Sequence, residues 1–417
     1  MRCDRVGSHP YKFHPAQCEN GFVPVLTFQE ARSTVLREVS QDRILPPAEQ
    51  VPLGEAAGRV LAEPVYADRD LPALDRSMRD GYAVRSADLP GRASVVGQVR
   101  AGEIFTGAVE WCEAVEIMTG APVPKGTDAV IMLEHVTRKD DVIEVERTVK
   151  PGENINPRGI DAKAGTVVLE PGRRIGYGEV ALLATVGYAT VSVYRKPQVA
   201  ILATGDELVG IDELPLDYQI RNSNLYSLAA QVRQAGGGAV LLPVARDRAA
   251  ETRDLMERGL SADLLLISGG VSAGKYDLVE DALRGLGAEF YFDRVAIQPG
   301  APLVFGKARD KFFFGLPGNP VSTMVTFELF ARSALDLVAG CKASARPLLW
   351  ARMTQDFKHR PGLTRFLPAK IECGDITPIA WKGSNDIVSF CRANGFLVAD
   401  AKRESWVAGD LIQAFLK

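Results

Sequence analysis

The chain has 417 residues, of which 46% are hydrophobic and 24% charged, and its formal net charge is -3. This length and composition predict several soluble domains with substantial cores. The slightly acidic balance argues against a general nucleic-acid or membrane surface, and no apolar run approaches the roughly 20 residues of a membrane helix. We therefore expect a cytoplasmic protein with neither nucleic acid nor membrane as a partner.

The cysteines and the start of the chain carry little chemical signal. The 6 cysteines follow no disulfide framework, and the sequence does not begin with a signal-peptide pattern, so we expect reduced thiols. Cys3, His9, His14 and Cys18 lack the spacing of a standard zinc finger. Residues 1–24 are therefore expected to be a tail rather than a metal site.

The first half of the chain is predicted to be one helix followed by a β-rich region. Thr27 and Glu30 form a capping box in front of an apolar helical face, and Pro46-Pro47 closes the segment. A second, short helix is expected over 55–62. From Val65 to Tyr194 the chain is rich in turns and alternating valines, with strands expected over 142–149 and 191–194.

From Pro197 onward, strands and helices alternate. Strands are expected over 199–202, 239–244, 264–267, 302–305 and 312–314. Ser223 or Asn224 is placed to cap one helix, and Asn319 with Pro320 begins another that runs to about residue 339. The pattern predicts an open, mostly parallel α/β sheet, followed beyond Arg346 by a small β-barrel.

One stretch of the α/β region, Ala262-Asp-Leu-Leu-Leu-Ile-Ser-Gly-Gly-Val-Ser-Ala-Gly-Lys-Tyr-Asp277, predicts a buried strand, a glycine-rich loop and a helix start in direct succession. Gly269, Gly270 and Gly274 permit a tight turn, and Asp277 is placed to cap the next helix. Such a loop at the end of a parallel strand is a natural phosphate cradle. It has neither Walker A nor dinucleotide-binding spacing, so a purely structural turn remains the alternative.

Acidic residues follow several strands of this sheet. Glu207, Asp247 and Asp277 should converge at one edge, because ligands in open α/β folds bind at the carboxyl ends of the strands. Carboxylates beside an anion-binding loop would repel a phosphate unless a divalent cation bridged them, which predicts Mg²⁺ or a similar ion. The alternative for each acid is an ordinary helix or loop cap.

A set of motifs occurs in one order along the chain: Asp80-Gly-Tyr-Ala-Val84, Met118-Thr-Gly-Ala-Pro-Val-Pro124, Pro157-Arg-Gly-Ile-Asp161, Thr204-Gly-Asp-Glu-Leu208, Ser268-Gly-Gly-Val-Ser272, Pro299-Gly-Ala-Pro302 and Leu316-Pro-Gly-Asn-Pro-Val-Ser322. Together they closely resemble the molybdopterin molybdenumtransferase family, the relatives of the gephyrin E domain. Arg392-Ala-Asn-Gly395 also fits, and the resemblance extends from about Val25 to the C-terminus.

The resemblance implies an enzyme that takes adenylylated molybdopterin and molybdate, releases AMP, and leaves the metal on the dithiolene. It implies a homodimer, with other proteins of molybdenum cofactor biosynthesis as further partners. The expected domains are a tail (1–24), a helix packing on the α/β domain (25–45), a linking domain (46–69 and 162–196), a β-rich domain that serves the partner's active site (70–161), a molybdopterin-binding α/β domain (197–345) and a C-terminal β-barrel (346–417).

Carried onto matching positions, the resemblance implies three overlapping groups of site residues. The catalytic candidates are Asp80, Thr119, Asp161, Glu207 and Asp277, and the Mg²⁺ ligands are Glu207, Asp247 and Asp277. Thr119 and Asp80 have an alternative as ordinary turn residues. The substrate-binding candidates are Gly269, Gly270, Ser272, Gly274, Arg294, Pro317, Gly318, Asn319, Pro320 and Ser322. Among them Ser322 is a candidate molybdate donor, and Arg294 has an alternative as a solvated surface residue.

One departure from the family concerns positive charge. Many members carry lysines where this chain has Gln298 and Ala301. We expect weaker binding of molybdate or of the terminal phosphate unless Arg294 and Lys275 compensate, and tungstate stays open as the oxyanion. A non-catalytic pterin-binding scaffold or carrier is the alternative function. The adenylylating enzyme of the preceding step is a third, disfavoured because that activity does not need the β domains.

Overall fold

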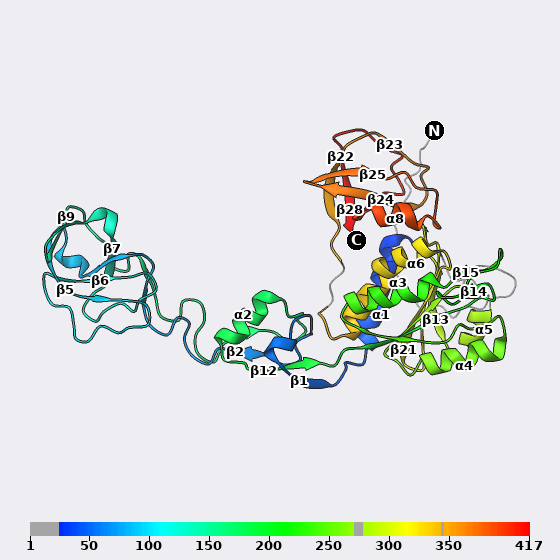
Figure 1. Cartoon of the computed structure of the whole chain (residues 1–417), viewed down its shortest axis with the longest axis horizontal. Coiled ribbons are helices and arrows are strands. Elements are labelled where there is room, and N and C mark those ends of the chain that lie inside the picture. Colours follow the sequence, from blue (N-terminus) through cyan, green and yellow to red (C-terminus); the bar gives the residue numbers. More distant parts are fainter. Residues whose placement is uncertain (1–24, 271–277, 343–345) are drawn as a thin grey trace, which may run out of the picture. The chain divides into compact units, whose positions relative to one another are not determined.

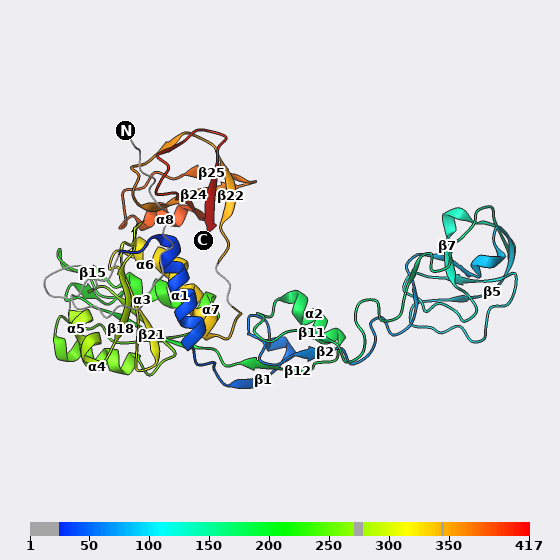
Figure 2. The same cartoon turned by 180° about the vertical axis from the view of Figure 1, so that it is seen from behind.

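The computed structural model describes residues 25–270, 278–342 and 346–417. These residues divide into two compact units (Figure 1, and from behind in Figure 2). Unit 1 contains the described residues up to Pro46 and those from Arg195 to Lys417, and unit 2 is Pro47–Tyr194. Within the described ranges, no helix is long and apolar enough to cross a membrane.

The largest element of unit 1 is an open six-stranded sheet. Its strands, in spatial order, are β16 (Gly238–Leu241), β13 (Gln198–Ala203), β17 (Leu264–Ser268), β21 (Lys311–Leu316), β20 (Pro302–Ala308) and β18 (Glu289–Arg294). Pairing is parallel from β16 to β21, whereas β20 and β18 are antiparallel additions at one edge. Every residue of β17 is buried, as expected of a central parallel strand. The prediction of an open, mostly parallel sheet is confirmed.

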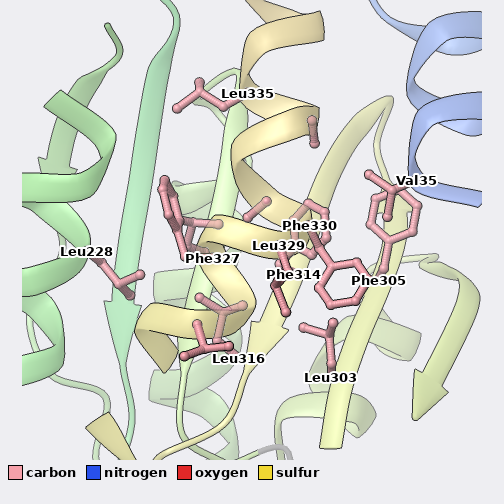
Figure 3. Packing of buried hydrophobic residues seen from close by; sticks show 14 of the residues in the cluster. Val35, Leu228, Leu303, Phe305, Phe314, Leu316, Phe327, Leu329, Phe330 and Leu335 are labelled. Atoms are coloured by element: carbon pink, nitrogen blue, oxygen red, sulfur yellow. The ribbon is translucent and has the colours of Figure 1, made fainter. Parts of the chain in front are cut away.

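Helices cover both faces of this sheet. They are α1 (Phe28–Asp42), α3 (Ser223–Gln234), α4 (Ala249–Gly259), α5 (Leu278–Gly285), α6 (Pro320–Thr326), the π-helical turn η4 (Phe327–Ala331) and α7 (Arg332–Val338). Alternate residues of β17 belong to two separate cores: Leu264 and Leu266 pack with α1, α3 and α7, and Leu265 and Ile267 pack with α4 and α5. Figure 3 shows the first core, with Val35, Leu228 and Leu335 pointing inward from their three helices.

Local sequence signals explain where two helices begin. The capping box of α1 is present, with Glu30 N–H donating to Thr27 Oγ1 at 3.3 Å and Thr27 N–H donating to Glu30 Oε2 at 2.8 Å. The cap of α3 differs from the prediction by one or two residues, because Asn222 Oδ1, not Ser223 or Asn224, accepts the Leu225 N–H at 3.2 Å.

One further expectation about helices is wrong, and another is confirmed only in part. The helix over 55–62 does not form: only a 3₁₀ turn, η1 (Leu53–Glu55), is present, because Gly58 adopts a φ of 78°, which a right-handed helix cannot contain. Asn319 occupies the N-cap position of α6 and Pro320 begins the helix, as predicted, although the Asn319 side chain makes no capping bond. Its Nδ2 instead donates to Ser384 Oγ at 2.8 Å, since the C-terminal domain packs against this loop.

The C-terminal region is a closed barrel, as predicted. Its five strands are β22 (Leu349–Met353), β24 (Thr364–Glu372), β25 (Asp375–Pro378), β26 (Gly395–Ala399) and β28 (Leu411–Leu416), with β24 pairing β26 to close the ring. The smaller elements of unit 1 are β14 (Leu208–Val209), β15 (Ile220–Arg221), β19 (Ile297–Gln298), β23 (Phe357–Lys358), β27 (Ser405–Trp406) and α8 (Ile387–Arg392). The short strand β19 adds to β24, so the α/β domain and the barrel share backbone pairing.

Unit 2 is mostly β, as predicted. Its main sheet contains β7 (Ala129–Met132), β4 (Gly81–Val84), β6 (Glu113–Ile117), β5 (Gly91–Val99), β9 (Val142–Val145) and β8 (Thr137–Lys139). The remaining strands pair as β1 (Ala48–Pro52) with β12 (Thr190–Tyr194), β2 (Val65–Tyr66) with β11 (Val167–Leu169), and β3 (Arg76–Ser77) with β10 (Ile155–Asn156), beside η2 (Ser86–Asp88), η3 (Leu133–His135) and α2 (Tyr177–Thr185). The sequence did not predict α2, and β9 is shorter than the expected strand over 142–149.

Candidate functional site

A cavity of about 650 Å³ lies where β13, β17 and β21 end. Its wall contains Glu207 and Asp247 from two strand-end loops and Gly269 with Gly270 from a third. The predicted convergence of these loops is therefore found in the structure. The same wall includes Pro317, Gly318 and Pro320 from the loop before α6. Ser272, Gly274 and Asp277, which were predicted for this site, lie outside the described residues.

The glycines of the loop after β17 are required by close contacts. Gly269 and Gly270 have φ values of 90° and 66°, in the region that favours glycine. A Cβ on Gly269 would lie 2.8 Å from Thr204 O, and one on Gly270 would lie 2.6 Å from Val279 Cγ2. The Gly269 N–H donates to Leu316 O at 3.2 Å and is thus already used by the fold. The structural turn therefore explains both glycines, which also line the cavity.

The carboxylates at the cavity suit a hard cation in their chemistry. Glu207 and Asp247 are both exposed and line the same cavity. A Cβ on Gly205 would lie 2.4 Å from Glu207 Oε2, so this carboxylate occupies the space that the glycine leaves open. Oxygen donors of this kind are the ones that Mg²⁺ prefers. Within the described ranges, no group of three or more His, Cys, Asp or Glu side chains is placed to hold a metal. Of the three predicted ligands, Glu207 and Asp247 are described, and Asp277 lies outside the described residues.

Asn224 joins two walls of the cavity, a role that the sequence did not predict. Its Nδ2 donates to Ser268 Oγ and to Gly318 O, each at 2.8 Å. Gly318 O can only accept, which fixes the orientation of the amide. The bond holds the loop before α6 against the end of β17. The available sequence signal was an asparagine near a helix start, which indicates a cap as readily as a tertiary bond.

A second hollow, of about 320 Å³, adjoins the first and shares Pro302 and Pro317 with it. Ser322, Asn319 and Gln298 line it from the α/β domain, and Trp381 and Ser384 line it from the C-terminal region. The sequence missed these last two residues, because only the packing of the barrel brings them here. The predicted residue Arg294 is exposed and lines neither hollow.

The candidates in unit 2 fall into two places. Asp80 precedes β4 and Thr119 follows the neighbouring strand β6, and Asp80 Oδ1 accepts hydrogen bonds from Thr119 N–H at 2.6 Å and from Thr119 Oγ1 at 2.9 Å. These bonds, the backbone one first, lower the pKa of Asp80. Asp161 lines a separate hollow of about 330 Å³ together with Leu71 and Thr166. The structure therefore pairs Asp80 with Thr119, and neither of them lines the hollow at Asp161.

Comparison with known proteins covers nearly the whole chain. Residues 26–187 match the family described as MoeA N-terminal region (domain I and II), residues 200–336 the probable molybdopterin binding domain, and residues 350–416 the MoeA C-terminal region (domain IV). The molybdopterin molybdenumtransferase of Bacillus subtilis is 34% identical over 384 residues, which cover 88% of this chain and 89% of the relative. That of Staphylococcus epidermidis is 32% identical over 376 residues, which cover 87% and 90%.

Solved structures agree with these relatives. A molybdopterin biosynthesis MoeA protein from Pyrococcus horikoshii has 30% sequence identity and a TM-score of 0.78, with 94% of this chain and 100% of that chain covered. A second crystal structure from Pyrococcus horikoshii has 33% identity and a TM-score of 0.70, with 94% and 99% covered. The chain therefore belongs to the molybdopterin molybdenumtransferase family and is an enzyme of the transferase class.

Proposed function

We propose that the enzyme inserts molybdate into adenylylated molybdopterin and releases AMP in a Mg²⁺-dependent reaction. The observation that carries this proposal is the meeting of Glu207, Asp247 and the glycine loop in one cavity at the carboxyl edge of the α/β sheet. Its volume of about 650 Å³ suits a ligand of the size of a pterin nucleotide. The names of the relatives support molybdopterin and molybdate as substrates.

The residues of the cavity have distinct parts in this proposal. Glu207 and Asp247, together with Asp277 by resemblance, would hold Mg²⁺, which when bound neutralises charge on the phosphate oxygens during cleavage of the phosphoanhydride. Gly269 and Gly270 permit the tight turn, packed against Thr204 and Val279, that brings the backbone of this loop into the wall where a phosphate would bind. Asn224 keeps the two loops of the wall together, so that Pro317 and Pro320 present a fixed surface.

The oxyanion is assigned to the second hollow, beside Ser322 and Ser384. Ser384 Oγ accepts a hydrogen bond from Asn319 Nδ2, which leaves its own hydroxyl proton for an anion. Gln298 and Ala301 supply no charge there, in contrast to the lysines of many family members. Arg365 is the register partner of Gln298 in the parallel β19–β24 pair, and its buried Nε lacks a hydrogen-bond partner among the described residues. Arg365 does not itself line the hollow, so its positive charge would favour a bound anion through the electrostatic field rather than by a direct hydrogen bond.

We further propose a homodimer in which Asp80, Thr119 and Asp161 of one copy serve the site of its partner. The support is that these residues lie in unit 2, whereas Glu207 and Asp247 lie in unit 1. Because the proposed substrate carries an adenylyl group, an adenylylating enzyme must supply it, and that enzyme is the expected partner in the same biosynthesis. A cytoplasmic location remains a prediction from composition.

One experiment tests the proposed reaction. The purified protein is incubated with adenylylated molybdopterin, Mg²⁺ and either molybdate or tungstate, and AMP is followed by chromatography. We expect AMP release that requires both the metal and an oxyanion, and the preferred oxyanion identifies the physiological substrate. Tight binding of molybdopterin without any AMP release under these conditions would instead support the scaffold or carrier function.

A further inference from the structure

Arg246 binds the backbone of the loop that carries Glu207. It follows β16 and directly precedes Asp247 in the chain. Its guanidinium Nη1 donates to three carbonyl oxygens of that loop, those of Asp206 at 3.0 Å, Leu208 at 3.1 Å and Gly205 at 3.4 Å. A single side chain thus holds the backbone on both sides of Glu207.

Other bonds connect the same two strand ends in both directions. Asp247 N–H donates to Asp206 Oδ1 at 3.2 Å, and Gly205 N–H donates to Ala245 O at 3.1 Å. Thr252 Oγ1 of α4 donates to the carbonyl oxygen of Arg246 at 3.2 Å, which fixes the backbone from which the guanidinium extends. The segment before α4 and the loop after β13 therefore form one hydrogen-bonded structure.

The position of the Glu207 carboxylate depends on this loop. Glu207 is exposed, so its side chain is not fixed by surrounding hydrophobic packing. Its carboxylate lies over the Cα of Gly205, which has a φ of 142°. Since the Gly205 carbonyl is one of the three that Arg246 binds, loss of the guanidinium would free the backbone against which the carboxylate rests.

We propose that Arg246 is a positioning residue that fixes Glu207 and Asp247 at the separation and orientation needed to bind one divalent cation. This inference rests on the proposed Mg²⁺ site. Arginine suits the task because it stays charged and its long side chain brings Nη1 within reach of all three carbonyl oxygens. Arg246 is assigned no contact with substrate or with the reacting atoms.

The sign of the effect separates this role from a purely electrostatic one. A positive charge beside two carboxylates opposes the binding of a second cation by Coulomb repulsion. If Arg246 acted only through its charge, its removal would tighten metal binding. If it acts by holding the loop, its removal weakens metal binding, because the two carboxylates no longer converge.

The test uses Mn²⁺ as a paramagnetic probe for the Mg²⁺ site and needs no turnover. Free Mn²⁺ is measured by electron paramagnetic resonance during titration of the full-length protein, the Arg246→Ala and Arg246→Lys variants, and Asp247→Asn. Arg253→Ala is the matched control, since Arg253 Nη2 also donates to a backbone carbonyl, that of Gly285 at 3.2 Å, away from the cavity. We expect Arg246→Ala to raise the dissociation constant about tenfold or more, as removal of groups that orient metal ligands does.

Two further measurements sharpen the result. Lysine at position 246 keeps the charge on a shorter side chain, so we expect a smaller rise in the dissociation constant. Added guanidinium ion should restore part of the Mn²⁺ affinity to Arg246→Ala and none to Asp247→Asn. Thermal unfolding shows whether each variant folds. If Arg246→Ala does not fold, Arg246→Met, which keeps the length of the side chain but has no donor, is titrated in its place, and an affinity equal to that of the unchanged protein would overturn the proposal.

The remaining outcomes are also decisive. Tighter binding by Arg246→Ala would overturn the positioning role in favour of simple repulsion. Equal binding by Arg246→Ala, when Asp247→Asn has lost the ion, would overturn this inference and leave the proposed function intact. If the unchanged protein has no Mn²⁺ site that Asp247→Asn removes, the proposed metal site is wrong and this inference is wrong with it.

Discussion

Asp80 accepts two hydrogen bonds from Thr119 on a single carboxylate oxygen, one from the backbone N–H at 2.6 Å and one from the hydroxyl at 2.9 Å. Both motif residues were selected from the sequence, each with an ordinary turn role as its alternative. The bonds link the start of β4 to the end of β6 and favour the ionised carboxylate. The pair can therefore both close a turn and present a permanent negative charge at neutral pH.

This relationship gives a prediction about pH. The hydrogen bonds lower the pKa of Asp80, so its contribution to stability is present above the pKa of the unfolded chain and is lost as the pH falls through the lower pKa of the folded state. Thr119→Val removes the hydroxyl bond and keeps the backbone bond, so the pKa of Asp80 should rise only part of the way to its ordinary value. Carboxyl chemical shifts followed by NMR from pH 6 to pH 2 would measure this, and an unchanged pKa would show that the hydroxyl bond is not formed in solution.

A second prediction concerns the carboxylates of the cavity. Glu207→Gln should lower Mg²⁺-dependent AMP release on the order of a hundredfold, the scale for removing one preorganised charged group from an active site. Because Glu207 is exposed, the free energy of unfolding should change by less than about 0.5 kcal/mol. Asp254→Asn is the control, since Asp254 is 71% exposed on α4 of the same domain and lines neither hollow.

A similar substitution tests Asp277, the third predicted Mg²⁺ ligand. Because Asp277 lies outside the described residues, this test rests on the chemistry of the side chain and not on its position. Asparagine caps helices about as well as aspartate. Asp277→Asn should therefore leave stability unchanged and abolish AMP release if Asp277 is a metal ligand. Near-normal turnover with the same Mg²⁺ dependence would contradict that role.

The parts of the fold that could be predicted from the sequence are those determined by a few neighbouring residues. The capping box at Thr27 and Glu30 needs only a few consecutive residues, and the apolar run of β17 specifies a strand buried on both faces. Convergence of Glu207 and Asp247 follows from topology, because parallel strands end at the same edge. In contrast, the helix expected over 55–62 does not form, because Gly58 adopts a positive φ that the composition of the segment does not reveal.

The residues that sequence missed depend on long-range packing. Ser384 and Trp381 reach the second hollow only because the barrel packs beside the loop before α6. Arg246 is one arginine in a polar segment until the structure places its guanidinium on three carbonyls of a different loop. Neither case leaves a periodic or local pattern in the chain. Such residues can be named as functional candidates only after the fold is known.

A third prediction separates steric from conformational requirements in the glycine loop. Gly269 and Gly287 both have positive φ, but a Cβ on Gly287 meets nothing within 4 Å, whereas one on Gly269 meets Thr204 O at 2.8 Å. Gly287→Ala should therefore cost only the backbone strain, about 1–2 kcal/mol. Gly269→Ala should cost at least about 1 kcal/mol more and weaken substrate binding, because the loop must move. Urea unfolding of both variants checks this, and equal losses would contradict the close contact.

A fourth prediction concerns the missing lysines. Gln298→Lys should tighten apparent molybdate binding, and the gain should shrink with salt because a partly exposed charge acts through a field screened over about 10 Å at 0.1 M. Gln234→Lys is the control, because Gln234 is exposed at the end of α3 and lines neither hollow. Titrations of each variant with molybdate at low and high ionic strength would measure this gain in affinity. A gain of equal size at both strengths would point to a direct hydrogen bond rather than to the screened field.

The last prediction tests whether two copies share a site. Asp80 belongs to unit 2 and Glu207 to unit 1, so a shared site would combine the Asp80 of one copy with the Glu207 of the other. Asp80→Asn and Glu207→Gln chains, each expected to have little activity alone, are co-expressed with different tags and the mixed dimer is purified. In that dimer one site would carry both changes and the other neither, so it should have about half the activity of the unchanged dimer.

An unpurified mixture with free exchange would contain about half mixed dimers and should show about a quarter of the full activity. The control is a mixture of Glu207→Gln with Asp247→Asn, both changed in unit 1, where every site of every dimer keeps one lesion and no rescue is expected. Mixed dimers whose composition is verified by mass and that remain inactive would show that Asp80 and Glu207 act within one chain. The division of labour between the two units would then have to be assigned to a single copy.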